Sequence, residues 1–157
     1  MTRTRGRAPR GERVVTAVPG GHWKIVTVIS AVRTTDPFAA ATVVGPTDSD
    51  VFRTWVKEVL CPHLRPGEVV VMDNLSPHKV AGIREAIESA GASVRYLPPY
   101  SPDFNPIEPM WSKVKSRLRS LAARTLDTLH DAVGQAIATV THADCRGYFR
   151  HCGYNAT

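Results

Sequence analysis

Runs of β-branched and other apolar residues dominate the first half of the chain. The stretch 22–33 (HWKIVTVISAVR) predicts a β-strand, and 38–44 predicts a second strand after a turn at 34–37. This pair therefore predicts an antiparallel hairpin. A shorter run at 12–18 predicts a further strand. The run 68–72 (EVVVM) is apolar throughout, which is typical of a strand buried on both faces.

Helical periodicity occupies much of the remaining chain. A helix capped by Asp48 or Ser49 is predicted over 50–64, and a second, ended by Gly91, over 79–90. A short strand is expected at 93–97, and the four prolines of 98–106 exclude regular structure there. Three further helices are predicted over 107–122, over 125–139 and within 141–157. The order of elements predicts an α/β domain with a mixed sheet flanked by helices.

Length and composition narrow the class of protein. The chain has 157 residues, the size of one ordinary domain. It is 43% hydrophobic and 22% charged, which argues against wholesale disorder. No apolar run approaches the ~18 residues of a membrane span, and three cysteines suit a reducing compartment. We therefore expect a cytoplasmic protein without a membrane partner.

Two basic segments carry the positive charge. The net charge is +6, with +4 in residues 1–13, +5 in residues 109–124 and −3 in the remainder. Such segments on a mildly acidic body indicate contacts with nucleic acid, and the alternative is a solvated arm and a solvated helix face. The candidate DNA-binding residues are Arg3, Arg5, Arg7, Lys113, Lys115, Arg117 and Arg119.

Asp73 is the first candidate for chemistry. It directly follows the apolar run 68–72, so it lies at the carboxyl end of a strand, the edge where open α/β sheets place ligands. The alternative is that Asp73 and Asn74 begin a loop and cap the next turn. Asn74 is a candidate for orienting Asp73 or a water. His78 is a candidate for reaching the site or a phosphate, and otherwise is a histidine at a helix start.

Glu108 is the second candidate. Asn105 suits the N-cap and Pro106 the first position of a helix, so Glu108 falls where it completes a capping box. Capping alone would account for this carboxylate. At 100° per residue, however, Lys115 and Arg119 follow Glu108 on one flank of the helix. A carboxylate followed by cations suits a metal site beside a nucleic-acid backbone.

The two carboxylates together resemble a known pattern. The stretches VVVMDNLSPHK and YLPPYSPDFNPIEPMWSKVKSRLR are similar to the catalytic core of DDE/D transposases of the mariner superfamily, especially its bacterial insertion-sequence branch. The 34 residues between Asp73 and Glu108 match the spacing of that group's second and third acidic residues. GRAPRGERV and FRHCGY resemble it too, so the likeness covers essentially the whole chain.

The resemblance implies an RNase H-like fold and Mg²⁺-dependent cutting of transposon ends, with Mn²⁺ as a substitute. It also implies joining of the freed 3′-hydroxyl to target DNA. Asp73 and Glu108 are the implied catalytic, metal-binding residues, with Asn74, His78 and Asn105 in support. The family's first acidic residue lies on the central strand, before the segment matched by RTRGRAPRGERV. We therefore expect 1–157 to be one partial catalytic domain without that strand.

This expectation defines the predicted function. The chain is predicted to be an N-terminally truncated transposase fragment, inactive alone, with 1–13 as a basic arm and no N-terminal helix-turn-helix domain. The alternative is a non-catalytic DNA-binding or subunit-binding remnant. The expected partners are transposon and target DNA, a second copy, or a missing N-terminal portion supplied from an overlapping frame. The expected location is the bacterial cytoplasm, associated with the nucleoid.

Overall fold

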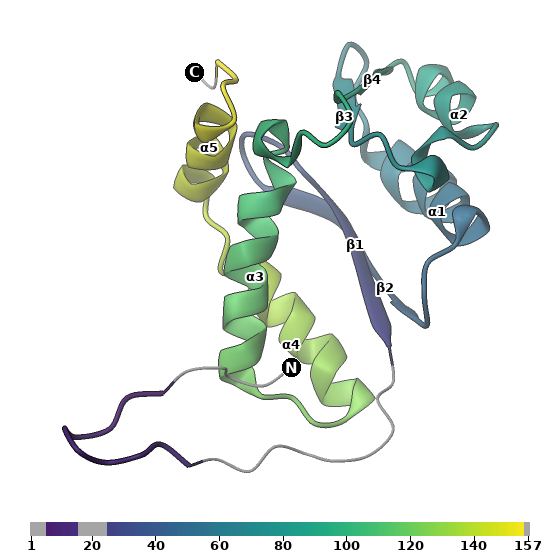
Figure 1. The fold of residues 1–157 in the computed structure, drawn as a ribbon. Helices are drawn as coiled ribbons and strands as arrows, with labels where there is room; N and C mark the ends of the chain where they lie inside the picture. The colour runs from purple at the N-terminus through teal and green to yellow at the C-terminus, as the bar shows by residue number, and fades with distance from the viewer. Residues whose placement is uncertain (1–5, 16–24, 156–157) are drawn as a thin grey trace.

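A β-hairpin separates two helical layers in the fold (Figure 1). The computed structural model describes residues 6–15 and 25–155. Strands β1 (Val26–Val32) and β2 (Pro37–Val44) pair antiparallel, from Val26 opposite Val44 to Val32 opposite Pro37. This confirms the predicted hairpin. On one side lie α3, α4 and α5, and on the other α1, α2, β3 and β4.

A bulge in β2 ties the hairpin to the first helix. Ala39 and Ala40 lie opposite the single residue Ser30, and Ala39 takes a left-handed φ of 51°. The Ala39 carbonyl accepts a buried hydrogen bond of 2.8 Å from Nε1 of Trp55. The irregular strand geometry therefore provides an acceptor for an indole donor that would otherwise be buried unpaired.

The first helix, called the α1 rod below, is continuous and changes helix type twice. It comprises α1 (Ser49–Trp55), a π turn (Val56–Leu60) and a 3₁₀ turn (Cys61–His63). Asp48 is the N-cap, since its carboxylate accepts hydrogen bonds from the backbone N–H groups of Asp50 and Val51. The predicted cap and extent are thus confirmed, although the second half is not a regular α-helix.

A parallel strand pair follows. Strands β3 (Val69–Met72) and β4 (Ser93–Tyr96) are connected through a 3₁₀ turn (Ser76–Lys79) and α2 (Ile83–Ser89). The predicted start of this helix at residue 79 is wrong. Pro77 falls in the 3₁₀ turn and Gly82 takes a left-handed φ of 89°, so the α-helix begins only after Gly82.

The second helical layer agrees closely with the sequence pattern. It contains α3 (Ile107–Leu121), α4 (Leu126–Ile137) and α5 (His142–His151), preceded by a 3₁₀ turn at Pro102–Phe104. Thr125 and Thr141 cap α4 and α5 through side-chain hydrogen bonds to backbone N–H groups.

The hairpin contributes to two hydrophobic cores. One core contains Phe52, Trp55 and Leu60 with residues of α2, β3 and β4, and the other joins α3, α4 and α5. Because side chains alternate along a strand, Ile29 of β1 packs against the first core and Val28 against the second. The hairpin is therefore the middle layer between two sets of helices.

The predicted α/β class with antiparallel and parallel strands flanked by helices is confirmed, and the strands form two separate pairs. Within residues 6–15 and 25–155, β1 pairs only with β2, and β3 pairs only with β4. The outer edges of β1 and β3 therefore have no partner strand in the described part. The expected burial of β3 on both faces is wrong at its first residue, because Val69 is 55% exposed.

The chain before the hairpin has little regular structure in its described part. Residues 6–15 contain no helix or strand and extend away from the body (Figure 1). The predicted strand at 12–18 is therefore wrong over 12–15, and 16–18 lie outside the described residues. No helix in 6–15 or 25–155 is long and apolar enough to cross a membrane.

Trp55→Phe is expected to lower the free energy of unfolding by about 1–3 kcal/mol, because the buried Ala39 carbonyl loses its donor. Urea unfolding followed by circular dichroism measures the change. Trp111→Phe is the control, since Trp111 is only half buried. Equal losses for both variants would contradict this role of the indole N–H.

Candidate functional site

A cleft of about 600 Å³ lies between the two strand pairs. Residues 27–33 line it from β1, and residues 69–73 line it from β3 and its end. The α1 rod contributes Phe52 and Trp55, and α3 contributes Ile107 and Trp111. The cleft is thus bounded by two strand edges and by two apolar helical walls.

The two predicted catalytic carboxylates line this same cleft. Asp73 follows β3 and Glu108 lies in the first turn of α3, so two residues with 34 others between them in the sequence line one cleft. His78 and Asn105, two of the predicted supporting residues, also line it. Asn74 is half buried and is not among the lining residues. No metal ligand cluster of three or more His, Cys, Asp or Glu side chains occurs in 6–15 or 25–155.

Asp73 is restrained by its neighbours. Its Oδ1 accepts a hydrogen bond of 3.2 Å from the backbone N–H of Leu75 and lies 2.6 Å from Nδ1 of His78. The turn-capping role considered for Asp73 is therefore present, together with exposure to the cleft. The side chain is 38% exposed, so it remains accessible to a cation.

His78 is held in the cleft wall. Its ring centroid lies 4.3 Å from that of Phe52, and its backbone carbonyl accepts a hydrogen bond of 2.9 Å from the Tyr96 hydroxyl. The imidazole is thereby fixed beside Asp73. It reaches the carboxylate that the sequence predicts to be functional, and it does so from a 3₁₀ turn rather than from a helix start.

The capping box predicted for Asn105 and Glu108 is wrong. The backbone N–H of Asn105 donates 2.9 Å to the Pro102 carbonyl, which closes the 3₁₀ turn before α3. That donor is consequently not available to the Glu108 carboxylate, which is exposed. Asn105 Oδ1 instead accepts a long hydrogen bond of 3.4 Å from the backbone N–H of Ile107. Helix capping therefore does not account for the Glu108 side chain.

The cations of α3 divide between two faces. Lys115 and Arg119 lie on the flank of Glu108, and Lys115 is exposed. Lys113 and Arg117 border a second groove, of about 770 Å³, with Ser112, Ser116 and Ser120. Lys113 lies 2.5 Å from Asp144 of α5, so this predicted DNA-binding charge is already paired within the chain. Arg7 is exposed in the arm, whereas Arg3 and Arg5 lie outside the described residues.

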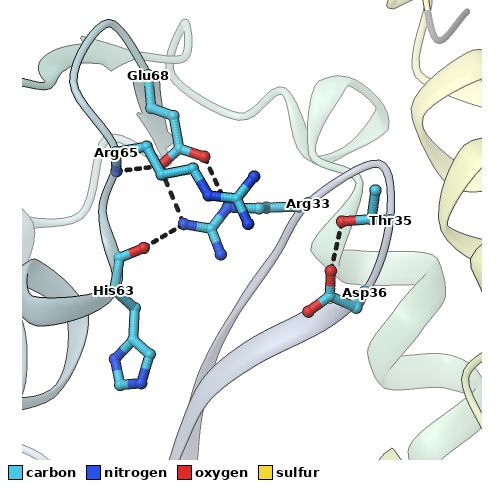
Figure 2. Close-up of polar contacts among 6 residues, drawn as sticks. All are labelled: Arg33, Thr35, Asp36, His63, Arg65 and Glu68. Atoms are coloured by element: carbon cyan, nitrogen blue, oxygen red, sulfur yellow. Dashed lines mark hydrogen bonds and ion pairs between the residues drawn. The ribbon is translucent and has the colours of Figure 1, made fainter.

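A charged clamp that the sequence does not indicate joins Arg33, which follows β1, to Glu68, which precedes β3 (Figure 2), and both residues line the cleft. The Arg33 guanidinium donates to both Glu68 oxygens, at 2.7 and 3.0 Å, and to the His63 carbonyl. It also lies 3.7 Å from the centre of the Phe38 ring. The hydrogen bond from Arg33 lowers the pKa of Glu68, and the reciprocal interaction raises the pKa of Arg33. The only sequence signal was an arginine ending an apolar strand.

Comparison with solved structures identifies the class of fold. The fold is similar to that of the Mos1 mariner transposase in the crystal structure of its paired-end complex with Mn, with a TM-score of 0.71 at 14% identity. The match covers 97% of this chain and 47% of that chain, so this chain spans about half its length. The fold is therefore of the mixed α/β, RNase H-like class.

The family is shown by the sequence. Residues 1–130 match the family described as DDE superfamily endonuclease, and the chain belongs to this family. No curated protein matches the chain. The expected resemblance to DDE transposases is thus confirmed at the level of family and fold.

Loss of the Arg33–Glu68 clamp is expected to be destabilising. Both side chains are mostly shielded, and hydrogen bonds between charged groups contribute about 1.5–3 kcal/mol. A double-mutant cycle with Arg33→Gln and Glu68→Gln, measured by urea unfolding, should give a coupling energy of that order. Arg84→Gln and Glu88→Gln provide the control cycle, because that pair is about half exposed. Equal coupling in the two cycles would contradict the clamp.

The Lys113–Asp144 pair predicts an acid-dependent loss of stability. Hydrogen bonds from Lys113 and from Thr141 lower the pKa of Asp144 from 3.8 to about 2. The contribution of the ionised Asp144 to the free energy of unfolding is therefore complete above pH 3.8 and is lost as the pH falls towards 2. Asp144→Asn should flatten this part of the curve of melting temperature against pH. Asp131→Asn, on the exposed face of α4, should leave the curve unchanged; an unchanged curve for Asp144→Asn would refute the assignment.

Proposed function

We propose that this chain forms the larger part of a transposase catalytic domain, which in complete form cleaves DNA at transposon ends and joins the freed 3′-hydroxyl to target DNA. The observation that carries the proposal is that Asp73 and Glu108 line one cleft in a DDE superfamily fold. Neither carboxylate is paired with a lysine or arginine in the described part of the chain. Both are accessible from solvent.

The donor set fits a hard divalent cation. Mg²⁺ takes oxygen ligands and is commonly held by one or two carboxylates together with waters and substrate phosphates. Asp73 and Glu108 supply the carboxylates, and the Asn105 amide oxygen lies at the same cleft. When bound, such a cation polarises a phosphoryl oxygen and lowers the pKa of a bound water. Mn²⁺ accepts the same oxygen ligands.

The chain's own residues then have distinct tasks. His78 fixes the orientation of Asp73, while the exposed Glu108 adjusts to the ligand. Lys115 lies about two helical turns beyond Glu108 on the same flank of α3, where it binds a backbone phosphate of the DNA. The apolar walls formed by Phe52 and Trp111 limit water in the cleft behind the carboxylates.

We further infer that the cleft accepts one more β-strand, supplied by polypeptide outside the described residues. Neighbouring strands lie ~4.8 Å apart, so one inserted strand requires its two neighbours ~9.6 Å apart. β1 and β3 present their unpaired edges to the cleft, and the Arg33–Glu68 side chains bridge its end. A carboxylate on that strand, at the Asp73 end, supplies the third acid of the site. We favour a segment of a different polypeptide over a second copy of this chain as the source of that strand.

The chain alone is therefore expected to bind metal weakly and not to cleave DNA. The alternative function, a DNA-binding or subunit-binding remnant without chemistry, is favoured because no three His, Cys, Asp or Glu side chains in the described residues form a metal-ligand cluster. Glu68, the third acid that lines the cleft, is paired with Arg33. The two functions are distinguished by supplying a strand-forming segment that carries an acidic residue. The DNA upstream of Met1 is read in all frames for a strand-forming segment with an acidic residue, and that segment is co-expressed.

Nicking of supercoiled plasmid with Mg²⁺ or Mn²⁺ tests the proposal. The chain alone should show no nicking, and the co-expressed complex should nick. Asp73→Asn and Glu108→Gln should each reduce nicking at least 100-fold, because each removes a charge that neutralises the cation. Asp127→Asn, an exposed change on α4, is the matched control.

Each result of that assay has a clear meaning. Nicking by the chain alone that Asp73→Asn abolishes would refute inactivity while supporting the transposase function. No nicking by the complex, with DNA binding retained, would favour the remnant. Mn²⁺ titration followed by paramagnetic resonance adds a readout independent of cleavage, in which either variant should weaken binding about tenfold.

A further inference from the structure

Tyr100 has an unusual conformation for its residue type. Its side chain is fully exposed, at 103% relative accessibility, and its backbone has a left-handed φ of 56°. Glycine or asparagine adopts this region at lower cost than a bulky residue. No side-chain hydrogen bond or aromatic contact of Tyr100 occurs in the described part of the chain, so nothing there offsets the strain. The ring is thus exposed to solvent from a backbone conformation that is unfavourable for tyrosine.

The loop that carries Tyr100 is rigid. Four prolines fix much of its backbone in 98–106. The Ser101 hydroxyl donates to the Pro99 carbonyl at 3.3 Å, and the Tyr154 hydroxyl donates to the Phe104 carbonyl at 2.9 Å. A side chain on a preorganised loop loses little conformational entropy when it binds a partner. The loop therefore holds the Tyr100 ring in a defined position.

The loop begins beside the first carboxylate and ends at the second. The Leu97 N–H donates 2.8 Å to the carbonyl of Met72, the residue before Asp73. Tyr100 lies three residues beyond Leu97, so it is at most ~11 Å along the chain from that point. The loop then leads through Asn105 to Glu108. Tyr100 therefore lies in the loop that connects the Asp73 end of the strand pair to the helix that carries Glu108.

Other exposed apolar side chains accompany Tyr100. Leu75, two residues after Asp73, is 57% exposed, and Phe104, four residues before Glu108, is 51% exposed. Apolar surface thus gathers on the two loops that carry the carboxylates. The net charge of +6 and the exposed Lys115 on α3 favour a polyanionic occupant over a second protein. An occupant with both phosphate and flat aromatic groups matches this surface.

We propose that Tyr100 stacks on an unpaired nucleobase of the DNA strand whose phosphate lies at Asp73 and Glu108. This inference rests on the proposed function. Because the loop that carries Tyr100 connects the two carboxylates, and each nucleotide spans ~3.4 Å, we expect that base within a few nucleotides of the phosphate. Stacking on an aromatic ring tolerates every base, so Tyr100 adds affinity for unpaired strands without reading their sequence.

Oligonucleotide binding by the full chain tests this role. The probes are a blunt duplex and the same duplex with a three-nucleotide single-stranded extension that carries 2-aminopurine. Tyr100→Ala should weaken binding of the extended duplex about tenfold or more, abolish the quenching of 2-aminopurine fluorescence, and leave the blunt duplex unaffected. Tyr100→Trp should retain both affinity and quenching.

The Tyr100→Gly variant distinguishes the loss of the exposed ring from a loss of stability. This variant relieves the left-handed strain, so it should be at least as stable as the parent and yet lose quenching. If Tyr100→Ala or Tyr100→Gly retains quenching, Tyr100 does not stack on the base. If Lys115→Gln still weakens duplex binding in that case, only the stacking role is overturned and the proposed function stands. Failure of the parent chain to bind either DNA would overturn this inference and the proposed function together. A dimer that dissociates on Tyr100→Ala in sedimentation would assign the ring to a protein interface instead.

Discussion

The Arg33–Glu68 clamp is the contact on which the geometry of the cleft depends. β1 and β3 belong to different strand pairs, and no hydrogen-bonded ladder joins them in the described part of the chain. The guanidinium makes both hydrogen bonds to the carboxylate and a third to the His63 carbonyl, so it fixes direction as well as distance. Without it, the hairpin would be tied to the first core mainly through Trp55 and apolar packing. One ion pair therefore joins the two strand pairs where β1 ends and β3 begins.

The distribution of polarity along the cleft follows from this arrangement. Its walls are apolar where the α1 rod and α3 cover it, and its carboxylates lie at the end where β3 and β4 finish. Parallel strands bring their carboxyl ends to the same edge, so Asp73 after β3 and the loop after β4 are neighbours by topology. Glu108 reaches this edge because α3 begins directly after that loop. The two acids line the same cleft because of chain direction rather than because of sequence proximity.

Local signals in the sequence were sufficient to predict most of the helices and strands. The cap at Asp48, the hairpin and the extent of α3 depend on contacts within a few residues, and the structure confirms them. The family and the α/β class are also confirmed. The capping box at Glu108 failed because a 3₁₀ turn uses the Asn105 N–H first. Pairings such as Lys113 with Asp144, or Arg33 with Glu68, join residues more than 30 positions apart, and no local periodicity encodes them.

The two carboxylates differ in how their environment prepares them for a cation. Asp73 is fixed before any ligand arrives, because a backbone N–H and an imidazole both contact one of its oxygens. Glu108 has lost its expected helix-capping partner and retains the rotamer freedom of an exposed side chain. A cation bound between them therefore orders mainly Glu108, at an entropy cost of up to ~2 kcal/mol. A carboxylate on a rigid strand would add charge without that cost, so a strand beside β3 would be a favourable position for a further ligand.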